Sequence, residues 1–312
     1  MARKLSIGVN WAGNFDMDEI VDQAKIADDS GVHTLNVAEA WGPDALSLLA
    51  VVARETSNIQ LGTSIINIFS RTPGAMAQHF ATLDHISNGR MIIGLGSSGP
   101  QVIEHFHGIK FSKPLTRMHE YVDIINMLMR EEPLNYDGNV YQLSRGFTMR
   151  FTPLRDHIPI HIASITPKSL KQTAEIADGW IPIHLPKEQW RPQIDAITAN
   201  IEAAGRSRAD FVIRNPTGVR VTEDIEGARQ QVAGTTAFYI ARMGDFYYDH
   251  FQRMGYADEA NAVRRGWEEG GPAGGAAAIP DELVDQLGTA GGVEQCIEAM
   301  EEAEEAGFDW HS

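Results

Sequence analysis

The chain has only one cysteine, Cys296, among its 312 residues. An intrachain disulfide and a cysteine-based metal cluster are therefore excluded, and a reducing cytoplasm is the expected compartment. No window of 18 apolar residues occurs, so no membrane-spanning helix is expected. The first residues run straight into a strand pattern, without the layout of a signal peptide.

Positive charge is also scarce, because 26 Lys and Arg stand against 42 Asp and Glu, a formal net charge of −16. Such a surface repels nucleic acid and anionic membranes, and we expect neither as a partner. No group of His, Asp and Glu has the spacing of a metal site, and no Gly-x-Ser-x-Gly motif occurs. The sequence therefore predicts neither a metal enzyme nor a serine hydrolase of that type.

Strand-like and helix-like runs alternate from the N-terminus onward, and the strand-like runs are almost continuously apolar. This pattern is typical of a parallel sheet covered by helices. Seven such units in about 220 residues favour a (β/α)₈ TIM barrel, a single α/β domain over residues 1–312, over an open doubly wound sheet. The expected strands are residues 5–11, 34–38, 61–66, 90–96, 158–164, 179–185 and 211–221.

Two insertions interrupt this alternation. Residues 131–157 contain Asp137-Gly138, a hairpin turn signal, and predict an inserted β-hairpin. Residues 225–287 predict a helical insertion, interrupted by the stretch EEGGPAGGAAAIP, which we expect to be a flexible loop. Within it, MGDFYYDHFQRMGY is expected to cover the barrel or to contact another subunit. Only residues 308–312 remain for an eighth strand, which is therefore either very short or lies beyond Ser312.

The active site of a parallel barrel lies at the carboxyl ends of its strands. These ends carry hydroxyls, aromatics and small residues, and few paired carboxylates, which argues against a glycosidase. Two segments there resemble anion sites: GLGSSGP, where backbone N–H groups can approach a ligand, and ASITPKSLKQ at a helix start. An ordinary capped turn is the alternative for each. The strand-end residues are Asn10, Trp11, Glu39, Trp41, Ser64, Ile65, Asn67, Gly96, Ser97, Ser98, Ser164, Thr166, Lys168 and His184.

Several segments together resemble the bacterial-luciferase-like superfamily. The most specific is the string from Arg71 to Gly96, which reads Arg-x-Pro, then Thr-Leu-Asp-x-x-Ser-x-Gly-Arg, then Gly-Leu-Gly. The likeness is greatest to the branch that uses the deazaflavin coenzyme F-420, which includes methylenetetrahydromethanopterin reductase. The resemblance implies a TIM barrel and an oxidoreductase that transfers hydride between the coenzyme and a small organic substrate.

The resemblance also implies roles for individual residues. Strand three of the family ends in a non-prolyl cis peptide, expected here between Ser64 and Ile65, with Ile65 against the coenzyme ring. A trans bond with Ile65 as an ordinary core residue is the alternative. Arg71 is expected to act structurally at this polar end of the strand, with Ser70 hydrogen-bonded nearby. The implied coenzyme-binding residues are Asn10, Glu39, Thr63, Ser64, Ile65, Asn67, Gly96, Ser97, Ser98 and, around the phosphate, Ala163, Ser164, Thr166, Pro167 and Lys168.

Two positions depart from the sugar-phosphate dehydrogenases of this branch. They carry a histidine where this chain has Ala40 and a glutamate where it has Gly99, so alcohol oxidation is not expected and reduction of a C=C, C=N or C=O bond is favoured. Glu39 is a candidate proton donor, with a structural role as the alternative. His184 is a candidate for catalysis or substrate contact, and Trp11, Trp41 and Trp180 either wall a substrate pocket or merely pack.

Two other functions remain open. A flavin mononucleotide (FMN)-dependent monooxygenase of the same superfamily is the first, and a non-catalytic barrel that stores or senses a flavin is the second. The resemblance further implies a homodimer formed through helices that flank strands two and three.

Overall fold

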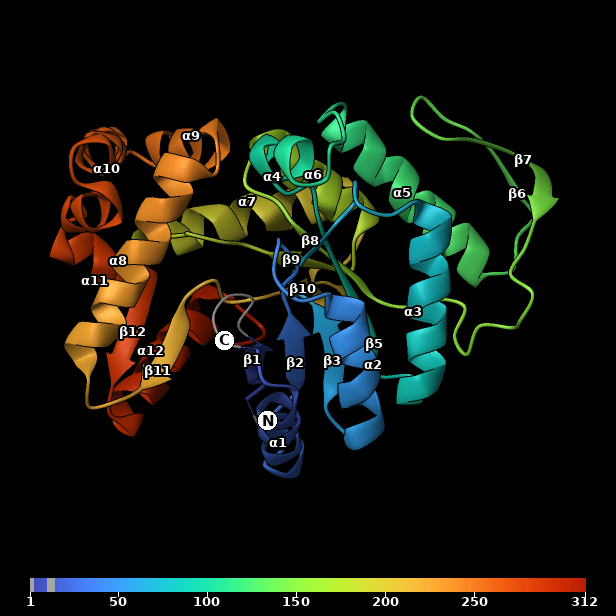
Figure 1. Cartoon of the computed structure of the whole chain (residues 1–312), viewed down its shortest axis with the longest axis horizontal. Helices are drawn as coiled ribbons and strands as arrows, with labels where there is room; N and C mark the ends of the chain where they lie inside the picture. The colour runs from blue at the N-terminus through green and yellow to red at the C-terminus, as the bar shows by residue number, and fades with distance from the viewer. Residues whose placement is uncertain (1–2, 10–14) are drawn as a thin grey trace.

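The computed structural model describes residues 3–9 and 15–312, which form one barrel with a side lobe (Figure 1). The barrel strands are parallel, in the order β1-β2-β3-β5-β8-β9-β10, with β4 also paired to β5. Their bounds are β1 (Ser6–Val9), β2 (Thr34–Val37), β3 (Gln60–Thr63), β4 (Ile66–Asn67), β5 (Met91–Gly96), β8 (Ile160–Ala163), β9 (Gly179–Ile181) and β10 (Val212–Ile213).

Two isolated strand pairings close the ring. Trp310 pairs with Arg214 after β10, and His311 pairs with Leu5 before β1, both in parallel. Residues 310–311 therefore take the place of the eighth strand. The TIM-barrel fold expected from the alternating pattern is confirmed.

Helices cover the outside of the barrel, and their bounds are α1 (Met17–Asp29), α2 (Ala45–Glu55), α3 (Pro73–Ser87), α4 (Pro100–His105), α5 (Pro114–Met129), α6 (Pro167–Ile176), α7 (Trp190–Ala203) and α12 (Val293–Ala306). Short 3₁₀ turns at Lys187–Gln189 and Arg208–Asp210 precede α7 and β10. None of the described helices combines the length and apolarity needed to cross a membrane.

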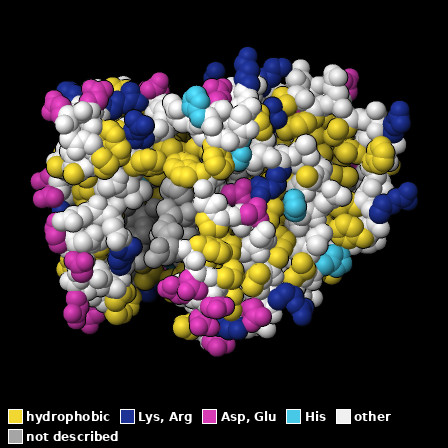
Figure 2. Space-filling view, in the orientation of Figure 1, with side chains coloured by type: hydrophobic (Ala, Val, Ile, Leu, Met, Phe, Trp, Pro, Cys, Tyr) yellow, Lys and Arg dark blue, Asp and Glu magenta, His cyan; other side chains and the backbone are white. Residues whose placement is uncertain are grey.

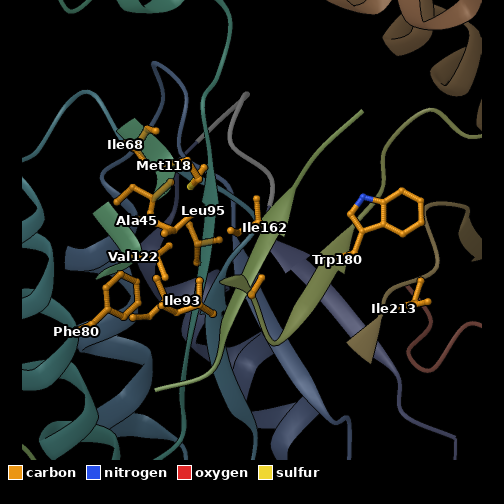
Figure 3. Packing of buried hydrophobic residues seen from close by; sticks show 14 of the residues in the cluster. Ala45, Ile68, Phe80, Ile93, Leu95, Met118, Val122, Ile162, Trp180 and Ile213 are labelled. Carbon is orange, nitrogen blue, oxygen red and sulfur yellow. The ribbon is translucent and has the colours of Figure 1, made fainter. Parts of the chain in front are cut away.

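The core lies between the strands and these helices. All six residues of β5 are buried, and Figure 3 shows Ile93 of this strand beside Phe80 of α3 and Val122 of α5. Fully burying side chains of this size stabilises the fold by about 1.5–3 kcal/mol each. The near-continuous apolar runs that predicted buried strands are explained by this two-sided burial.

Local hydrogen bonds set the helix starts. Asp16 caps α1, because its carboxylate accepts the N–H groups of Asp18 at 3.0 Å and Glu19 at 3.2 Å. Asp44 caps α2 in the same way through the N–H of Ser47 at 2.7 Å. These caps satisfy N–H groups that the first helical turn leaves without partners.

The predicted hairpin is present as antiparallel strands β6 (Leu134–Asp137) and β7 (Gln142–Phe147). It extends from the opposite side of the barrel from the lobe (Figure 1). The buried carboxylate of Glu120 on α5 anchors its turn by accepting the N–H groups of Asn139 at 2.6 Å and Tyr141 at 2.8 Å.

The lobe contains the helical insertion and a small parallel sheet of two strands (Figure 1). Its helices are α8 (Ile225–Arg242), α9 (Asp245–Arg253), α10 (Ala257–Ala277) and α11 (Asp281–Leu287), and its strands are β11 (Gly218–Val221) and β12 (Gly288–Gly291). The prediction that residues 211–221 form one strand, the seventh, is therefore wrong. It is divided between β10 of the barrel and β11 of the lobe.

The expectation of a flexible loop at the glycine- and alanine-rich stretch is wrong, because most of that stretch is helical. The chain turns back within α10 at Gly271, whose φ of 64° is left-handed, just before Pro272. The two arms then pack so closely that a Cβ at Gly266 would lie 2.4 Å from the carbonyl oxygen of Gly274. Glycine permits this backbone contact, so the stretch forms a tight helical hairpin that packs on α8.

Candidate active site

Two adjoining cavities lie at the carboxyl ends of the barrel strands. The barrel cavity, of about 330 Å³, is bounded by the ends of β1, β2 and β9 and by α8. The loop cavity, of about 250 Å³, lies between the segment after β5 and the start of α6. The two share Ile65, Ser98, Ala163, Ile183 and Tyr247, and they therefore form one continuous cleft.

Ile65 lies at the junction of the two cavities. The peptide bond that joins it to Ser64 is cis, as the resemblance implied. The backbone N–H of Glu39 donates to the carbonyl oxygen of Ile65 at 3.0 Å and ties the end of β2 to this bend. A Cβ at Gly96 would lie 2.7 Å from Cδ1 of Ile65, so glycine at position 96 makes room for the Ile65 side chain.

The polar segment that follows β3 is held by a network around Arg71. Its guanidinium donates to both oxygens of Glu39, at 2.5 and 3.1 Å, and to the carboxylate of Asp44. The N–H of Ala45 also donates to Glu39 at 3.0 Å, and the hydroxyl of Tyr121 donates to the carbonyl oxygen of Arg71 at 3.1 Å. The arginine thus fixes β2, β3 and the start of α2 relative to one another, which accounts for the polar end of a core strand.

Nine of the predicted site residues line the cleft: Glu39, Ser64, Ile65, Gly96, Ser97, Ser98, Ala163, Ser164 and Thr166. Glu39 lies at the edge of the barrel cavity with its carboxylate already bound by Arg71 and Ala45. These contacts favour an anchoring role, and its role as proton donor stays a prediction. Asn10 and Trp11 lie outside the described residues.

Four other predicted coenzyme residues do not line the cleft. The hydroxyl of Thr63 is buried and exchanges hydrogen bonds with the backbone of Gly94, at 2.8 and 3.0 Å, which joins β3 to β5. Asn67 is buried and caps its own turn, accepting the N–H groups of Phe69 at 3.0 Å and Ser70 at 2.7 Å. Both side chains have backbone partners, which favours a structural role, and their contact with the coenzyme stays a prediction.

Pro167 and Lys168 are both exposed at the start of α6, and neither lines the cleft. The predicted anion site at this helix start is also changed by a capping box. Ser169 donates its N–H to the hydroxyl of Thr166 at 3.2 Å, and Thr166 donates its N–H to the hydroxyl of Ser169 at 3.0 Å. Since Pro167 has no N–H, fewer backbone donors remain for a ligand than the sequence suggested.

The loop cavity is lined by hydroxyl and amide side chains, which offer a ligand polar groups in addition to the backbone N–H groups. Besides Ser97, Ser98, Ser164 and Thr166, the lining contains Ser169 and Gln172. Ser169 already donates its hydroxyl to the carbonyl oxygen of Thr166 at 3.0 Å, and Gln172 donates to that of Leu115 at 2.9 Å. The other hydroxyls can donate to an anionic or strongly polar part of a ligand without any cation. Ser169 and Gln172 were not among the predicted site residues, although both belong to the segment ASITPKSLKQ.

Two tyrosines on the opposite wall were also missed. Tyr239 of α8 lines the barrel cavity, and Tyr247 of α9 lines both cavities, with their ring centroids 4.7 Å apart. Neither hydroxyl has a hydrogen-bond partner among the described residues. Tyr247 belongs to the aromatic segment that was expected to cover the barrel or contact a subunit, and its place in the cleft could not be deduced from helical spacing.

The floor of the barrel cavity carries a buried cation, Arg214. Its guanidinium donates to Nδ1 of His161 at 3.0 Å and to Oδ1 of Asn36 at 2.9 Å, and lies 5.1 Å from the ring centre of Trp310. No carboxylate pairs with it among the described residues, and burial lowers its pKa to about 10. At neutral pH it therefore remains charged and makes the floor of the cavity electropositive.

The predicted substrate residues lie around the cleft. His184 lines a third cavity behind Tyr239, with the two ring centroids 4.6 Å apart. Burial, with His250 nearby, lowers the pKa of His184 to about 3, so the ring is neutral at physiological pH. Trp41 lines an outer groove beside Phe238, and Trp180 is buried, with its indole N–H donating to the carbonyl oxygen of Ser164 at 2.9 Å. The substrate contacts of His184 and Trp41 stay predictions.

The family model described as luciferase-like monooxygenase matches residues 6–310. The chain belongs to this family. One relative is a Mycobacterium tuberculosis protein provisionally named as a coenzyme F-420-dependent oxidoreductase, which is 35% identical over 97% of this chain and 92% of its own. Another is a 5,10-methylenetetrahydromethanopterin reductase of Archaeoglobus fulgidus, 28% identical over 97% of this chain and 91% of its own.

The same fold is seen in the coenzyme F-420-dependent tetrahydromethanopterin reductase of Methanopyrus kandleri, with a TM-score of 0.86 and 21% identity. The match covers 99% of this chain and 92% of that one. The family and the barrel implied by the sequence resemblance are both confirmed.

Proposed function

We propose that this family member binds coenzyme F-420 in the cleft at the barrel mouth and transfers hydride between it and a small organic substrate. We further propose that the reaction runs toward reduction of a C=C, C=N or C=O bond. The observation that carries the proposal is the continuous cleft that meets at Ile65, with hydroxyl and amide side chains on the side of α6 and Arg214, Tyr239 and Tyr247 around the barrel mouth. The name of the Mycobacterium tuberculosis relative supports the choice of coenzyme.

The lining fits the two chemical halves of such a coenzyme. The hydroxyls of Ser97, Ser98 and Thr166 in the loop cavity suit a phosphate-bearing tail, because they can donate to its oxygens. Ile65 and Ala163 are apolar residues at the junction, against which a planar ring can pack. The bound coenzyme supplies the hydride, while the barrel orients the substrate and excludes water.

The phenols of Tyr239 and Tyr247 are the candidates for donating a proton to the substrate. Burial raises the pKa of both hydroxyls, so each remains protonated at neutral pH. Because neither is bound to another described residue, either can donate to an oxygen or nitrogen of the substrate. This assignment gives the reduction an acid that does not depend on Glu39.

The lining also supports reduction over alcohol oxidation. Among the described residues of the barrel cavity, Glu39 is the only carboxylate, and its oxygens are held by Arg71 and Ala45. Ala40 lines the cavity where the sugar-phosphate dehydrogenases carry histidine. An alcohol would therefore find no free base there among these residues.

Titration of the apo protein with F-420 and, separately, with FMN tests this proposal through quenching of its six tryptophans. Micromolar or tighter binding of F-420 alone is the expected result. Preference for FMN, with oxygen consumption, would instead support a monooxygenase. Tight F-420 binding without turnover over a broad panel of unsaturated substrates would support a storage or sensing role.

A homodimer remains our prediction. Ile26 on α1 and Val51 on α2 are exposed apolar side chains on the helices that the resemblance implicates. A light-scattering mass of twice the chain is expected at micromolar concentration, and a monomer mass would contradict the prediction.

A further inference from the structure

A third cavity, the lobe cavity, lies outside the barrel between α8, α11 and the small sheet of β11 and β12. Its volume is about 410 Å³. In Figure 2 this face of the molecule is hollowed between the lobe and the barrel. The apolar side chains in its lining are Ile183, Pro216, Val219, Ile225, Ala228, Val232, Val284, Leu287 and Ala290.

Most of the charge in the lining of the lobe cavity is paired within the protein. The three charged side chains of its lining are Arg220, Arg229 and Asp285. Arg229 forms ion pairs with Asp285 and with Asp281, while Arg220 is exposed and hydrogen-bonded to Gln231. An anion could pair only with the exposed Arg220, and elsewhere in the cavity a charged ligand would lose its hydration without gaining a partner, so the cavity favours an uncharged molecule.

The lobe cavity adjoins the barrel cavity at Ile183 and Tyr239, which line both. Tyr239 therefore lies between the lobe cavity and the barrel cavity, which Ile65 also lines. His184 lies next to Tyr239 in the chamber wall, and its Nε2 is buried without a partner among the described residues. The phenol of Tyr239 and the imidazole of His184 thus lie in the wall of the lobe cavity that adjoins the barrel cavity.

We infer that the lobe cavity holds the body of the substrate. The substrate class is an uncharged, elongated, largely apolar molecule with its reducible carbonyl or conjugated double bond at one end, beside Tyr239. The position of that reactive end rests on the proposed function, whereas the binding of the apolar body does not. Residues of α8, Val232 above all, then determine the length and width of accepted substrates.

The test uses prodan, an uncharged, elongated naphthyl ketone whose emission shifts to the blue in apolar surroundings, added to the apo protein. Val232→Trp fills the chamber from α8, and Thr235→Trp fills it from an exposed position that tolerates a large side chain. Gln230→Trp is the matched control, because Gln230 lies on the same helix, is exposed and does not line the cavity. Thermal unfolding of each variant shows whether it is folded.

We expect blue-shifted prodan emission with the wild type and with Gln230→Trp. In Val232→Trp and Thr235→Trp the affinity for prodan should be reduced about tenfold or more, which corresponds to about 1.4 kcal/mol of binding free energy. Equal affinity in Thr235→Trp and Gln230→Trp would overturn the inference, as would tighter binding of the anionic probe anilinonaphthalene sulfonate than of prodan. The F-420 titration of the same proteins separates the two proposals. If the wild type does not bind F-420, the coenzyme assignment is refuted. The prodan result then still shows whether the lobe cavity binds an uncharged apolar molecule.

Discussion

On the wall of the barrel mouth that β2 and β3 form, the carboxylate of Glu39 accepts three hydrogen bonds and Arg71 pairs with two acids. On the opposite wall, formed by α8 and α9, the hydroxyls of Tyr239 and Tyr247 have no partner among the described residues. The first wall resembles a fold interior, where polar groups are satisfied within the protein. The second wall keeps donors free at the surface of a cavity, and free donors there are available to a ligand.

The comparison teaches that position at a strand end does not by itself make a residue part of a site. Glu39, Thr63 and Asn67 all lie at strand ends, yet the side chain of each is hydrogen-bonded to the protein backbone. We therefore propose that Arg71 and its partners position the ends of β2 and β3, whereas Tyr239 and Tyr247 contact the substrate.

The largest effect is expected from a substitution that removes the Arg71 ion pairs of the first wall. Arg71→Ala leaves the nearly buried Glu39 without its cation, and breaking such a pair costs about 3–5 kcal/mol of unfolding free energy. Arg191→Ala, which removes an exposed pair with Asp195, is the control and should cost less than about 1 kcal/mol. Urea unfolding measures both, and equal losses would show that the Arg71 network is not an anchor.

The second prediction concerns the opposite wall. Tyr239→Phe should lower kcat by about 10²–10⁴-fold, since an acid is lost, while the unfolding free energy stays almost unchanged because the hydroxyl has no protein partner. Tyr121→Phe is the matched control: its hydroxyl is bonded to the carbonyl oxygen of Arg71, and its loss should cost about 1 kcal/mol. A Tyr239→Phe enzyme with wild-type kcat would remove Tyr239 from the mechanism.

The third prediction concerns how stability depends on pH through His184 and His250, two neutral histidines behind the wall formed by α8 and α9. Burial lowers the pKa of His184 to about 3 and of His250 to about 4, against about 6.5 in an unfolded chain. Between these values the unfolded chain binds the proton first, so stability falls as the pH drops below 6.5. From pH 6.5 to 5 each histidine should remove about 2 kcal/mol.

The variant His250→Gln isolates one of these contributions. Its unfolding free energy should fall less steeply between pH 6.5 and 5 than that of the wild type, by about 2 kcal/mol over the interval. Parallel pH curves for the two proteins would mean that His250 is protonated in the folded state.

The smallest expected effect tests a residue that the resemblance placed at the coenzyme phosphate. Lys168 is exposed and lines none of the cavities described above. Lys168→Ala should therefore change F-420 affinity by less than about threefold, the scale of one screened surface charge. A loss of tenfold or more would restore Lys168 to the coenzyme site.

Much of the barrel could be predicted because its signals are local. The apolar runs, the Asp16 cap and the Asp137-Gly138 turn each depend on residues within a few positions of one another. The helical hairpin of α10 could not be predicted in this way, because its stability depends on the contact between Gly266 and Gly274 and on packing against α8.

The site was predicted in part for the same reason. The strand-end rule and the resemblance named Ile65, Gly96, Ser98 and Ala163, which all line the cleft, and their contact with the coenzyme stays a prediction. Neither could show that the Thr63 hydroxyl is taken up by Gly94, since β3 and β5 meet only in the folded barrel. Nor could helical spacing show that Tyr247 faces the cleft, because that depends on how the lobe packs on the barrel.

The most direct test of the account is the F-420 titration of Ala163→Phe. Ala163 lies where the loop and barrel cavities join, so the larger ring would occupy the space assigned to the coenzyme. The account predicts a folded protein whose F-420 affinity is at least about tenfold weaker than that of the wild type, or about 1.4 kcal/mol. Unchanged F-420 affinity in a folded Ala163→Phe protein would show that the coenzyme does not bind at this junction.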